Sequence, residues 1–371
     1  MEWLIAARGD VNSIYNFNCS DKYATPEEFT LKDGTPRPIL GYIDLLYGTI
    51  IMLLYVPCLC VMLQKENIRL SCFKIMFLLG FVDLCAIGVN SVTTGILLIE
   101  GAVYCSHPFA IFVTGALGLG LWCAACMICL ILVLNRVMDI LFPTLVKKYF
   151  SGSRTTMVLM IPVAYGLYFT FLTPPLLFTS KYQAWFFDPF IYADKTLEYQ
   201  NYPHTANNLF IVVATCGLYG YFCAAIAKQF RKRVESTNKR SHTQVSWYKV
   251  SQHKPNNPNV SYFQIFLQST LICLVNFVAA MIYVYMQFFP VADFVIVIGH
   301  ISWQLGHGCP AFIYLFMNTT IRSGVSRMFR LKRSYVHTKT ATVSTLGTHG
   351  HGHGHGHGHS HPSAHHSSSI H

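Results

Sequence analysis

Seven long apolar stretches, each nearly free of charged residues, constrain this chain more than any other feature. A helix that crosses the roughly 30 Å hydrocarbon core of a bilayer needs about 20 apolar residues. The stretches cover residues 45–63, 75–99, 108–134, 156–179, 207–227, 262–289 and 294–317. Backbone polar groups in lipid must be paired within the chain, and segments this long and apolar are helices rather than barrel strands. The sequence therefore predicts an all-α membrane protein, a seven-transmembrane helix bundle.

Charged residues are scarce, and this limits the domain organisation. They make up 12% of the 371 residues, about half the share in a soluble domain, and the apolar stretches leave no room for a separate soluble core. We expect an extracellular segment over 1–38, the bundle over 39–318, and a cytoplasmic tail over 319–371. No basic leader with a long apolar region is visible at the start, so the first span is expected to act as its own insertion signal.

The Lys and Arg residues predict the orientation. The segments after spans 1, 3, 5 and 7 hold 21 of the 27, and the other four segments hold 6. Positive charge stays on the cytoplasmic side, so the N-terminus is outside and the C-terminus inside; the alternative is a chance asymmetry. The net charge of +11 then indicates contact with inner-leaflet lipids and not with nucleic acid. The same asymmetry disfavours an inverted, insect-type odorant channel.

Of the 13 cysteines, only Cys19 and Cys105 fall in predicted extracellular segments. That compartment is oxidising, so they are candidates for a disulfide; the alternative is two free or intermolecularly bonded thiols. Asn18, Cys19 and Ser20 form a glycosylation sequon, which predicts a glycan on Asn18. Such a glycan would compete for space with a disulfide at Cys19.

Two cytoplasmic segments have biased compositions. Residues 228–261 hold eight Lys and Arg against one acid, Glu235, which indicates anchoring to the inner leaflet, docking of an intracellular partner, or both. Gly and His alternate from His349 to His359. Imidazoles at this density bind metal ions in vitro, but nothing fixes their geometry. We therefore predict a disordered low-complexity tail without a dedicated metal function, and no cofactor.

Three ionisable residues inside the spans are candidates for a function, because such groups are costly in lipid. Asp83 lies in the middle of span 2, and His300 and His307 lie two helical turns apart on span 7. A catalytic zinc needs three protein ligands, which these residues supply only if the two spans meet at the same depth. Neutral histidines bonded to neighbouring helices are the favoured interpretation. Gly115, Gly118 and Gly120 in span 3 predict close helix packing and, more weakly, space for a ligand.

Several motifs, taken in order, resemble the rhodopsin-like receptors that couple to G proteins. Asn135-Arg136-Val137 ends span 3 where that superfamily has Asp/Glu-Arg-Tyr, and Pro143 follows at the family spacing. The residues around Asp83 resemble the second-helix motif. Pro310 and Tyr314 resemble the Asn-Pro-x-x-Tyr motif with one extra residue, and residues 321–329 resemble the short amphipathic helix that follows span 7.

Departures from that pattern are equally informative. Asn135 cannot form the acid–arginine pair that helps to hold many such receptors inactive, and Cys309 replaces the Asn of the span 7 motif. The second outer loop has no cysteine, which leaves Cys19 as the candidate partner of Cys105. Span 7 has no lysine, so a retinal Schiff base is excluded there.

These departures resemble the nematode serpentine chemoreceptors of class T. The similarity rests on the stretches 54–59, 134–136 and 308–314, with Asn318 and Arg322, and extends over about residues 38–329. The resemblance implies a chemosensory receptor in the plasma membrane, in the cilia of sensory neurons, that signals through a heterotrimeric G protein.

A receptor of this kind needs an outer pocket and an inner coupling face. Aromatic and polar groups in the outer halves of the spans and in the second outer loop are candidates for contact with a small-molecule ligand, although many interfacial aromatics have no such role: Thr114, Trp185, Tyr283, Gln287, His300 and Trp303. Candidates for coupling and activation are Arg136, Asn135, Asp83, Pro310 and Tyr314.

Two other classes of function remain open. A transporter or metal-handling protein would use the His-rich tail, but an odd number of spans and a single buried acid argue against it. A seven-span zinc hydrolase would use Asp83, His300 and His307, yet no further His or acid is placed to assist. We therefore expect a receptor and not an enzyme.

Overall fold

The computed structural model describes residues 10–20, 22–23, 25–192, 196–241, 258–289 and 291–330. The chain divides into two compact units, Met1–Val325 and Ser326–His371. All packing discussed below lies within the first unit; the described residues of the second, 326–330, are helical. The predicted His-Gly tail lies outside the described residues, as do residues 242–257 of the basic segment 228–261.

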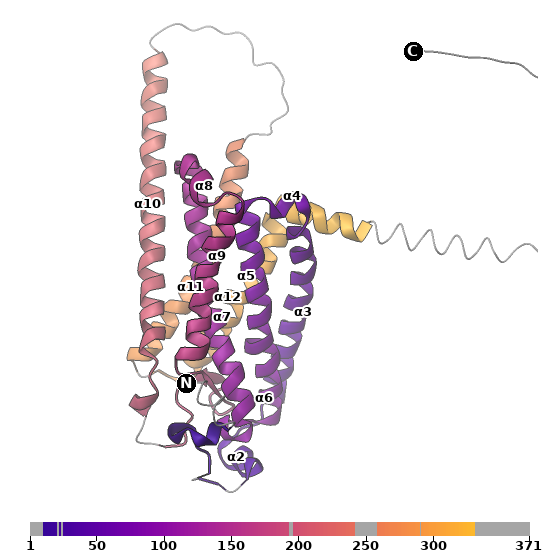
Figure 1. The fold of residues 1–371 in the computed structure, drawn as a ribbon. Coiled ribbons are helices and arrows are strands. Elements are labelled where there is room, and N and C mark those ends of the chain that lie inside the picture. The colour runs from indigo at the N-terminus through magenta and orange to yellow at the C-terminus, as the bar shows by residue number, and fades with distance from the viewer. Residues whose placement is uncertain are drawn as a thin grey trace, which may run out of the picture. The chain divides into compact units, whose positions relative to one another are not determined.

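Seven long helical segments form the first unit, one for each predicted span (Figure 1), and the seven-transmembrane bundle is confirmed. They are α3 (Pro38–Met62), the continuous run of α5 (Ser71–Ile87), η3 (Gly88–Thr93) and α6 (Thr94–Glu100), α7 (Pro108–Leu141), α9 (Ser153–Leu172), α10 (Tyr202–Ser241), α11 (Pro258–Phe288) and α12 (Asp293–Met317). Within the described residues, the first five segments meet the length and hydropathy of a membrane span, and α11 contributes a shorter apolar stretch, Thr270–Met286. Helix α12 is continuous, but the polar residues His300, Gln304 and His307 lower its mean hydropathy.

Short elements connect these helices. They are η1 (Val11–Ser13), η2 (Tyr15–Phe17), α2 (Pro26–Asp33), α4 (Lys65–Ile68), η4 (Tyr104–Ser106), α8 (Pro143–Tyr149), β1 (Leu177–Thr179), β2 (Ala184–Phe186) and η5 (Thr196–Tyr199). Strands β1 and β2 form an antiparallel hairpin in which Phe178 is opposite Trp185. The expectation that span 4 continues to Thr179 is wrong: α9 ends at Leu172, because Pro174 and Pro175 follow and proline cannot donate a helical hydrogen bond.

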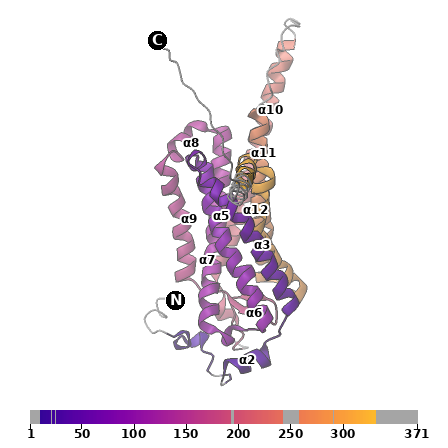
Figure 2. The same ribbon diagram turned by 90° about the vertical axis from the view of Figure 1, so that its right-hand side faces the viewer.

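Helix α7 is the central helix of the bundle. It packs against α5, α9, α10 and α11, and both views show it running among the other helices (Figure 2). In its most apolar window 78% of the residues are buried, against 39% for α3 and 28% for α9. A Cβ atom on Gly120 would collide with Thr170 and the Gly166 carbonyl of α9. The predicted close packing at this glycine therefore brings α7 and α9 together.

The N-terminal segment is fixed to the outer end of α7. Cys19 and Cys105 are disulfide-bonded, and Phe17 packs edge-on against Phe112 at 5.4 Å between ring centroids. The Tyr104 hydroxyl donates to the Phe17 carbonyl over 3.1 Å. Asn18, the predicted glycosylation site, is half-buried in this segment.

A further helix follows α12 over residues 319–330. The Asn318 side chain accepts a hydrogen bond from the Ile321 backbone N–H at 3.1 Å, which caps the first turn. Ile321 is fully buried in the first unit. The short helix expected after span 7 is thus present.

Candidate ligand pocket and signalling face

The outer half of the bundle contains a cavity of about 150 Å³ below the β1–β2 hairpin. Side chains of α7, α10, α11 and α12 form its walls together with the hairpin and its flanking residues. The walls are mainly aromatic and aliphatic: Leu119, Trp122, Leu176, Ala184, Trp185, Phe186, Phe187, His204, Tyr283, Met286, Val291, Ile296 and Trp303. None of these described residues is Asp, Glu, Lys or Arg. We call this cavity the outer pocket.

Two glycines of α7 leave room for two of the tryptophan walls. A Cβ atom on Gly115 would collide with the Leu176 carbonyl and lie 3.2 Å from the Trp185 ring. One on Gly118 would lie 3.1 Å from Val89 and in ordinary contact with the Trp303 ring, at 3.4 Å. Trp185 is also held by a 2.9 Å hydrogen bond from its Nε1 to Thr94 Oγ1. Two of the tryptophans that line the outer pocket thus pack close to small residues of the central helix.

A chain of hydrogen bonds orients the polar side of the outer pocket. Trp122 Nε1 donates to Asn208 Oδ1 over 3.1 Å, and Asn207 Nδ2 donates to the same oxygen over 3.0 Å. The Tyr165 hydroxyl donates to Asn207 Oδ1 over 3.1 Å. Asn208 Nδ2 lies 3.2 Å from His204 Nε2. Trp122 and His204 are thus positioned by a network that is itself buried.

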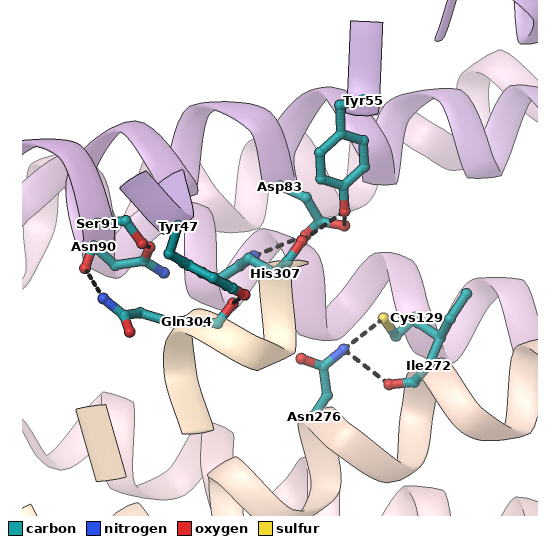
Figure 3. Close-up of polar contacts among 10 residues, drawn as sticks. All are labelled: Tyr47, Tyr55, Asp83, Asn90, Ser91, Cys129, Ile272, Asn276, Gln304 and His307. Atoms are coloured by element: carbon teal, nitrogen blue, oxygen red, sulfur yellow. Dashed lines mark hydrogen bonds and ion pairs between the residues drawn. The ribbon is translucent and has the colours of Figure 1, made fainter. Parts of the chain in front are cut away.

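A second buried network, which includes Tyr55, Asp83 and His307 (Figure 3), adjoins Trp122. The Trp122 ring packs edge-on against His307 at 5.9 Å between centroids. His307 Nδ1 lies 2.7 Å from Asp83 Oδ1, and the Tyr55 hydroxyl donates to Asp83 Oδ2 over 3.0 Å and to the His307 carbonyl over 2.6 Å. All three members, which we call the Asp83 network, are at most 1% exposed.

The Asp83 network bears on the metal-site hypothesis. Spans 2 and 7 do meet at Asp83 and His307, but His300 lies apart from them, in a separate cavity between α3 and α12 that Asp44 also lines. Across the described ranges, no three His, Cys, Asp or Glu side chains are placed to hold a metal ion. His307 on α12 is hydrogen-bonded to Asp83 on α5. This is the arrangement favoured from the sequence, a histidine bonded to a neighbouring helix.

Nearer the outside, Gln304 joins three helical segments (Figure 3). Its Nε2 donates to the Asn90 carbonyl over 2.9 Å. The same nitrogen donates to Asp44 Oδ1 over 3.1 Å. The Tyr47 hydroxyl donates to the Gln304 carbonyl over 3.1 Å. Asn90 belongs to η3, a π-helical turn, and such turns often occur at functional sites because they redirect backbone groups. Helix α12 is therefore connected to α3 and to η3 through polar contacts.

A polar contact also joins α7 to α11. Asn276 Nδ2 donates to Cys129 Sγ over 3.1 Å and to the Ile272 carbonyl over 3.4 Å (Figure 3). Tyr314 is fully buried, and its hydroxyl has no hydrogen-bond partner among the described residues. Pro310 lies inside α12, one turn before Tyr314.

The inner end of the bundle contains a larger cavity, of about 530 Å³. Its lining is rich in polar and charged side chains: Arg69, Leu70, Ser71, Cys72, Phe73, Asn135, Arg136, Asp139, Val146, Lys147, Phe150, Ser151, Gly152, Gln268, Met317, Asn318, Thr319 and Thr320. Asn135 Nδ2 donates to Ser71 Oγ over 3.2 Å, and the Arg136 guanidinium donates to Cys72 Sγ. Both residues thus hold the inner end of α7 to the first turn of α5. We call this the inner cavity.

The structure brings together only part of the predicted ligand set. Trp185, Tyr283 and Trp303 line the outer pocket. Thr114 lies outside it, and its hydroxyl donates to the Ala110 carbonyl of its own helix over 2.5 Å. His300 lines the separate cavity already described, and the Gln287 side chain is outside the described part of the chain.

Several residues that line the outer pocket are not among the residues predicted from the sequence, above all Trp122 and His204. Trp122 follows Gly118 by one helical turn, so both lie on the same face of α7. The spacing of the glycines, which predicts a narrow face of this helix, could therefore have identified Trp122 as its neighbouring aromatic residue. His204 lies outside the predicted span 5, which begins at residue 207. Helix α10 begins at Tyr202, which brings His204 onto the wall.

Comparison with known proteins agrees with this geometry. The family model for the serpentine type 7TM GPCR chemoreceptor Srt matches residues 7–338. Serpentine receptor class T-55 of Caenorhabditis elegans is 24% identical over 331 residues, which cover 88% of this chain and 84% of that relative. Squid rhodopsin has a similar fold, with a TM-score of 0.52 and 12% identity over 79% of this chain and 85% of that structure.

The family match covers nearly the whole chain, including all seven helical segments, the outer pocket and the inner cavity. The family is one of receptors of the plasma membrane and not of enzymes, so the hydrolase alternative is wrong. This chain belongs to the Srt family of serpentine seven-transmembrane G-protein-coupled chemoreceptors.

Proposed function

We propose that this receptor converts the binding of a small external molecule in the outer pocket into activation of a heterotrimeric G protein at the inner cavity. One observation carries the proposal: Trp122 belongs to the wall of the outer pocket and also contacts the Asp83 network through His307. A ligand that moves this ring would disturb a buried polar network shared by α3, α5 and α12.

Helix α12 is the element that would transmit the change. It contributes Trp303 to the outer pocket, His307 to the Asp83 network and Met317 to the inner cavity. Pro310 lies between His307 and Met317, and a helix bends most easily at proline because one backbone hydrogen bond is missing. A ligand shifts the population of states only if it binds one state more tightly. A different position of the Trp303 or Trp122 ring in the two states would give the ligand different affinities for them.

At the inner end, Arg136 and Asn135 are proposed to hold the resting state. Both bind the first turn of α5, through Cys72 and Ser71. Activation would release these contacts and expose the Arg136 guanidinium to a partner. An Arg side chain is suited to this task because its five donors can bind carboxylates or backbone carbonyls.

The test is signalling by the full-length chain expressed in cultured cells, read as calcium or cyclic nucleotide and screened against a panel of volatile and water-soluble odorants. Arg136→Ala should abolish the ligand-evoked response while the amount of receptor at the surface stays the same. Arg154→Ala is the matched control, because Arg154 lies outside the inner cavity and donates to the Lys148 carbonyl. A normal response from Arg136→Ala would contradict the proposal.

The family resemblance extends the proposal to location. We expect the receptor in the ciliary membrane of sensory neurons, with a glycan on the extracellular Asn18. A fluorescent fusion expressed in ciliated neurons tests the first point, and the electrophoretic mobility of Asn18→Gln tests the second. Uniform labelling of the cell body, or unchanged mobility, would contradict these two expectations separately.

A further inference from the structure

The cavity between α3 and α12 contains a carboxylate that no cation of the described chain neutralises. This cavity has a volume of about 270 Å³ and shares no lining residue with the outer pocket. Aliphatic side chains supply most of its lining: Leu40, Ile43, Leu98, Val297, Ile301 and Leu305. Asp44 is the only Asp, Glu, Lys or Arg in the described lining. We call this the α3–α12 cavity.

Asp44 has one oxygen without a partner. The residue lies in the second turn of α3, about 9 Å along the helix axis from Pro38. Its Oδ1 accepts a hydrogen bond from Gln304 Nε2 over 3.1 Å. Its Oδ2 has no hydrogen bond within the described residues and is not among the atoms that the protein encloses. An occupant of the α3–α12 cavity can therefore reach this oxygen.

No positive charge of the described chain compensates Asp44. None of the ion pairs among the described residues includes it. Arg37, two turns earlier, donates instead to the backbone carbonyls of Ser180 and Lys181. A carboxylate within a membrane span is costly unless an opposite charge or further hydrogen bonds stabilise it. Asp44 thus lacks a cation that the cavity has room to hold.

The other polar groups of the lining contribute less to selection. The Tyr47 hydroxyl already donates to the Gln304 carbonyl over 3.1 Å. Both ring nitrogens of His300 are enclosed by the protein, so no occupant of the cavity contacts them. The charge of Asp44 is therefore the feature that distinguishes one occupant from another.

The aliphatic lining determines the rest of the occupant. Leu40 and Ile43 of α3 and Ile301 and Leu305 of α12 are exposed on the outside of the bundle, where a membrane protein meets acyl chains. An engineered apolar cavity of about 150 Å³ holds benzene, so 270 Å³ accommodates a ring with a short chain. The occupant should therefore combine an apolar body with a single cationic group.

We propose that the α3–α12 cavity binds a primary ammonium group on an apolar body, with an N–H that donates to Asp44 Oδ2 and a body that packs against the aliphatic lining. This is a second site, and it does not depend on the outer pocket being the site for the external ligand. Two sources carry the group, a free lipophilic amine and a phospholipid with an ethanolamine headgroup. The experiment below separates them.

The test compares three molecules of similar shape on the purified full-length receptor in a nonionic detergent. 2-Cyclohexylethylamine carries the ammonium group at neutral pH, 2-cyclohexylethanol replaces it by a hydroxyl, and 3-cyclohexylpropanoate reverses the charge. A molecule that binds the folded receptor raises its unfolding temperature in proportion to occupancy. We expect the amine to bind about tenfold more tightly than the alcohol, because a charge-assisted hydrogen bond is roughly twice as strong as a neutral one. The carboxylate should bind more weakly than either.

Two matched variants assign the effect to Asp44. Asp44→Asn removes the charge but keeps an oxygen for Gln304 Nε2, so the preference for the amine over the alcohol should disappear. The alcohol should bind this variant as it binds the original receptor, which reports that the cavity is intact. Asp293→Asn removes an exposed acid in the first turn of α12, outside the cavity lining, and should leave the preference unchanged.

A lipid experiment identifies the source of the ammonium group. The unfolding temperature is measured in micelles that contain dioleoyl phosphatidylethanolamine or the corresponding choline lipid, whose ammonium has no N–H. Stabilisation by the ethanolamine lipid that is lost in Asp44→Asn supports the lipid as an occupant. Equal effects of the two lipids, with the amine still preferred over the alcohol, support the free amine.

Several results would overturn the site. These are tighter binding of the carboxylate than of the amine, an amine preference that survives Asp44→Asn, or one that is lost equally in Asp293→Asn. Equal binding of the amine and the alcohol, together with equal effects of the two lipids, would also overturn it. Each result concerns a cavity apart from the outer pocket, so the proposed function would stand.

Discussion

The outer pocket and the inner cavity lie at opposite ends of the same helices but differ in size and chemistry. The outer pocket has about 150 Å³ and is walled by aromatic and aliphatic groups. The inner cavity has about 530 Å³ and is lined largely by polar and charged groups at helix ends. The first suits a small apolar molecule, and the second suits a polar segment of a protein. The contrast shows how one bundle can present unlike surfaces to unlike partners.

Between the two cavities lies the Asp83 network, whose members are at most 1% exposed. Polar groups are costly at this depth in a membrane protein unless they are paired. Tyr55, Asp83 and His307 pair with one another across three helices. The Asp83 network therefore separates the two cavities. A substitution in one cavity should leave the other unaffected only if this network stays intact.

The largest effect is expected from Asp83→Ala, which would disrupt the layer that separates the cavities. It leaves His307 Nδ1 buried without its acceptor, so the free energy of unfolding should fall by about 3 kcal/mol. Thermal unfolding of the purified receptor measures this loss. Asp44→Ala is the matched control: Asp44 is half-buried, and Gln304 keeps its second bond to Asn90, so a loss of about 1 kcal/mol is expected. Equal losses of unfolding free energy in the two variants would mean that the complete burial of Asp83 and His307 does not increase the contribution of their contact to stability.

Removal of the disulfide should destabilise the outer half of the bundle and leave the inner half unaffected. The double variant Cys19→Ser, Cys105→Ser frees the N-terminal segment from the start of α7, and loss of a disulfide typically costs about 2–4 kcal/mol. Ligand potency should fall while the maximal response per surface receptor remains. Dose–response curves measure both quantities, with the exposed free thiol variant Cys60→Ser as the control. A lower maximal response with unchanged potency would contradict the separation of the two halves.

Filling the outer pocket from α7 should have a smaller and more local effect. In Gly118→Leu the new side chain meets Trp303 and Val89, and overpacking of this kind costs about 1–3 kcal/mol. Ligand potency should fall between about tenfold and a hundredfold. Gly217→Leu is the control, because a Cβ atom there meets nothing within 4 Å. Similar losses in both variants would show that the glycine spacing does not define the outer pocket.

The smallest effect is expected at the inner cavity from Asn135→Asp. The new carboxylate lies next to Arg136 and should strengthen the resting contact through a charge-assisted bond worth roughly 0.5–1 kcal/mol beyond the amide. Ligand-independent signalling should then fall about two- to fivefold, measured as basal cyclic nucleotide in unstimulated cells. Asn135→Ala, which removes the bond to Ser71, should raise it instead. Changes in the same direction would contradict the proposed role.

Much of the candidate site followed from local sequence patterns. Ionisable residues in lipid need a partner, which makes the aspartate of span 2 and the histidines of span 7 candidates, and Asp83 and His307 are partners. Trp185, Tyr283 and Trp303 are predicted outer aromatics, and all three line one cavity. His300 is a candidate for the same reason as His307, but it lies in another cavity. Spacing along one helix does not reveal which neighbouring helix each turn faces.

Span number, orientation and helix type were readable from the amino acids alone, because the bilayer acts as a solvent that imposes one length and one charge rule on every segment. The tertiary structure decided which side chains meet: the hairpin that brings Trp185 over the pocket, the network that orients His204, and the contacts of Asn135 and Arg136 with α5. Those contacts depend on helix rotation and on close approach at residues such as Gly115 and Gly118. Both are set by packing between segments distant in the chain, on which hydropathy and charge have no bearing.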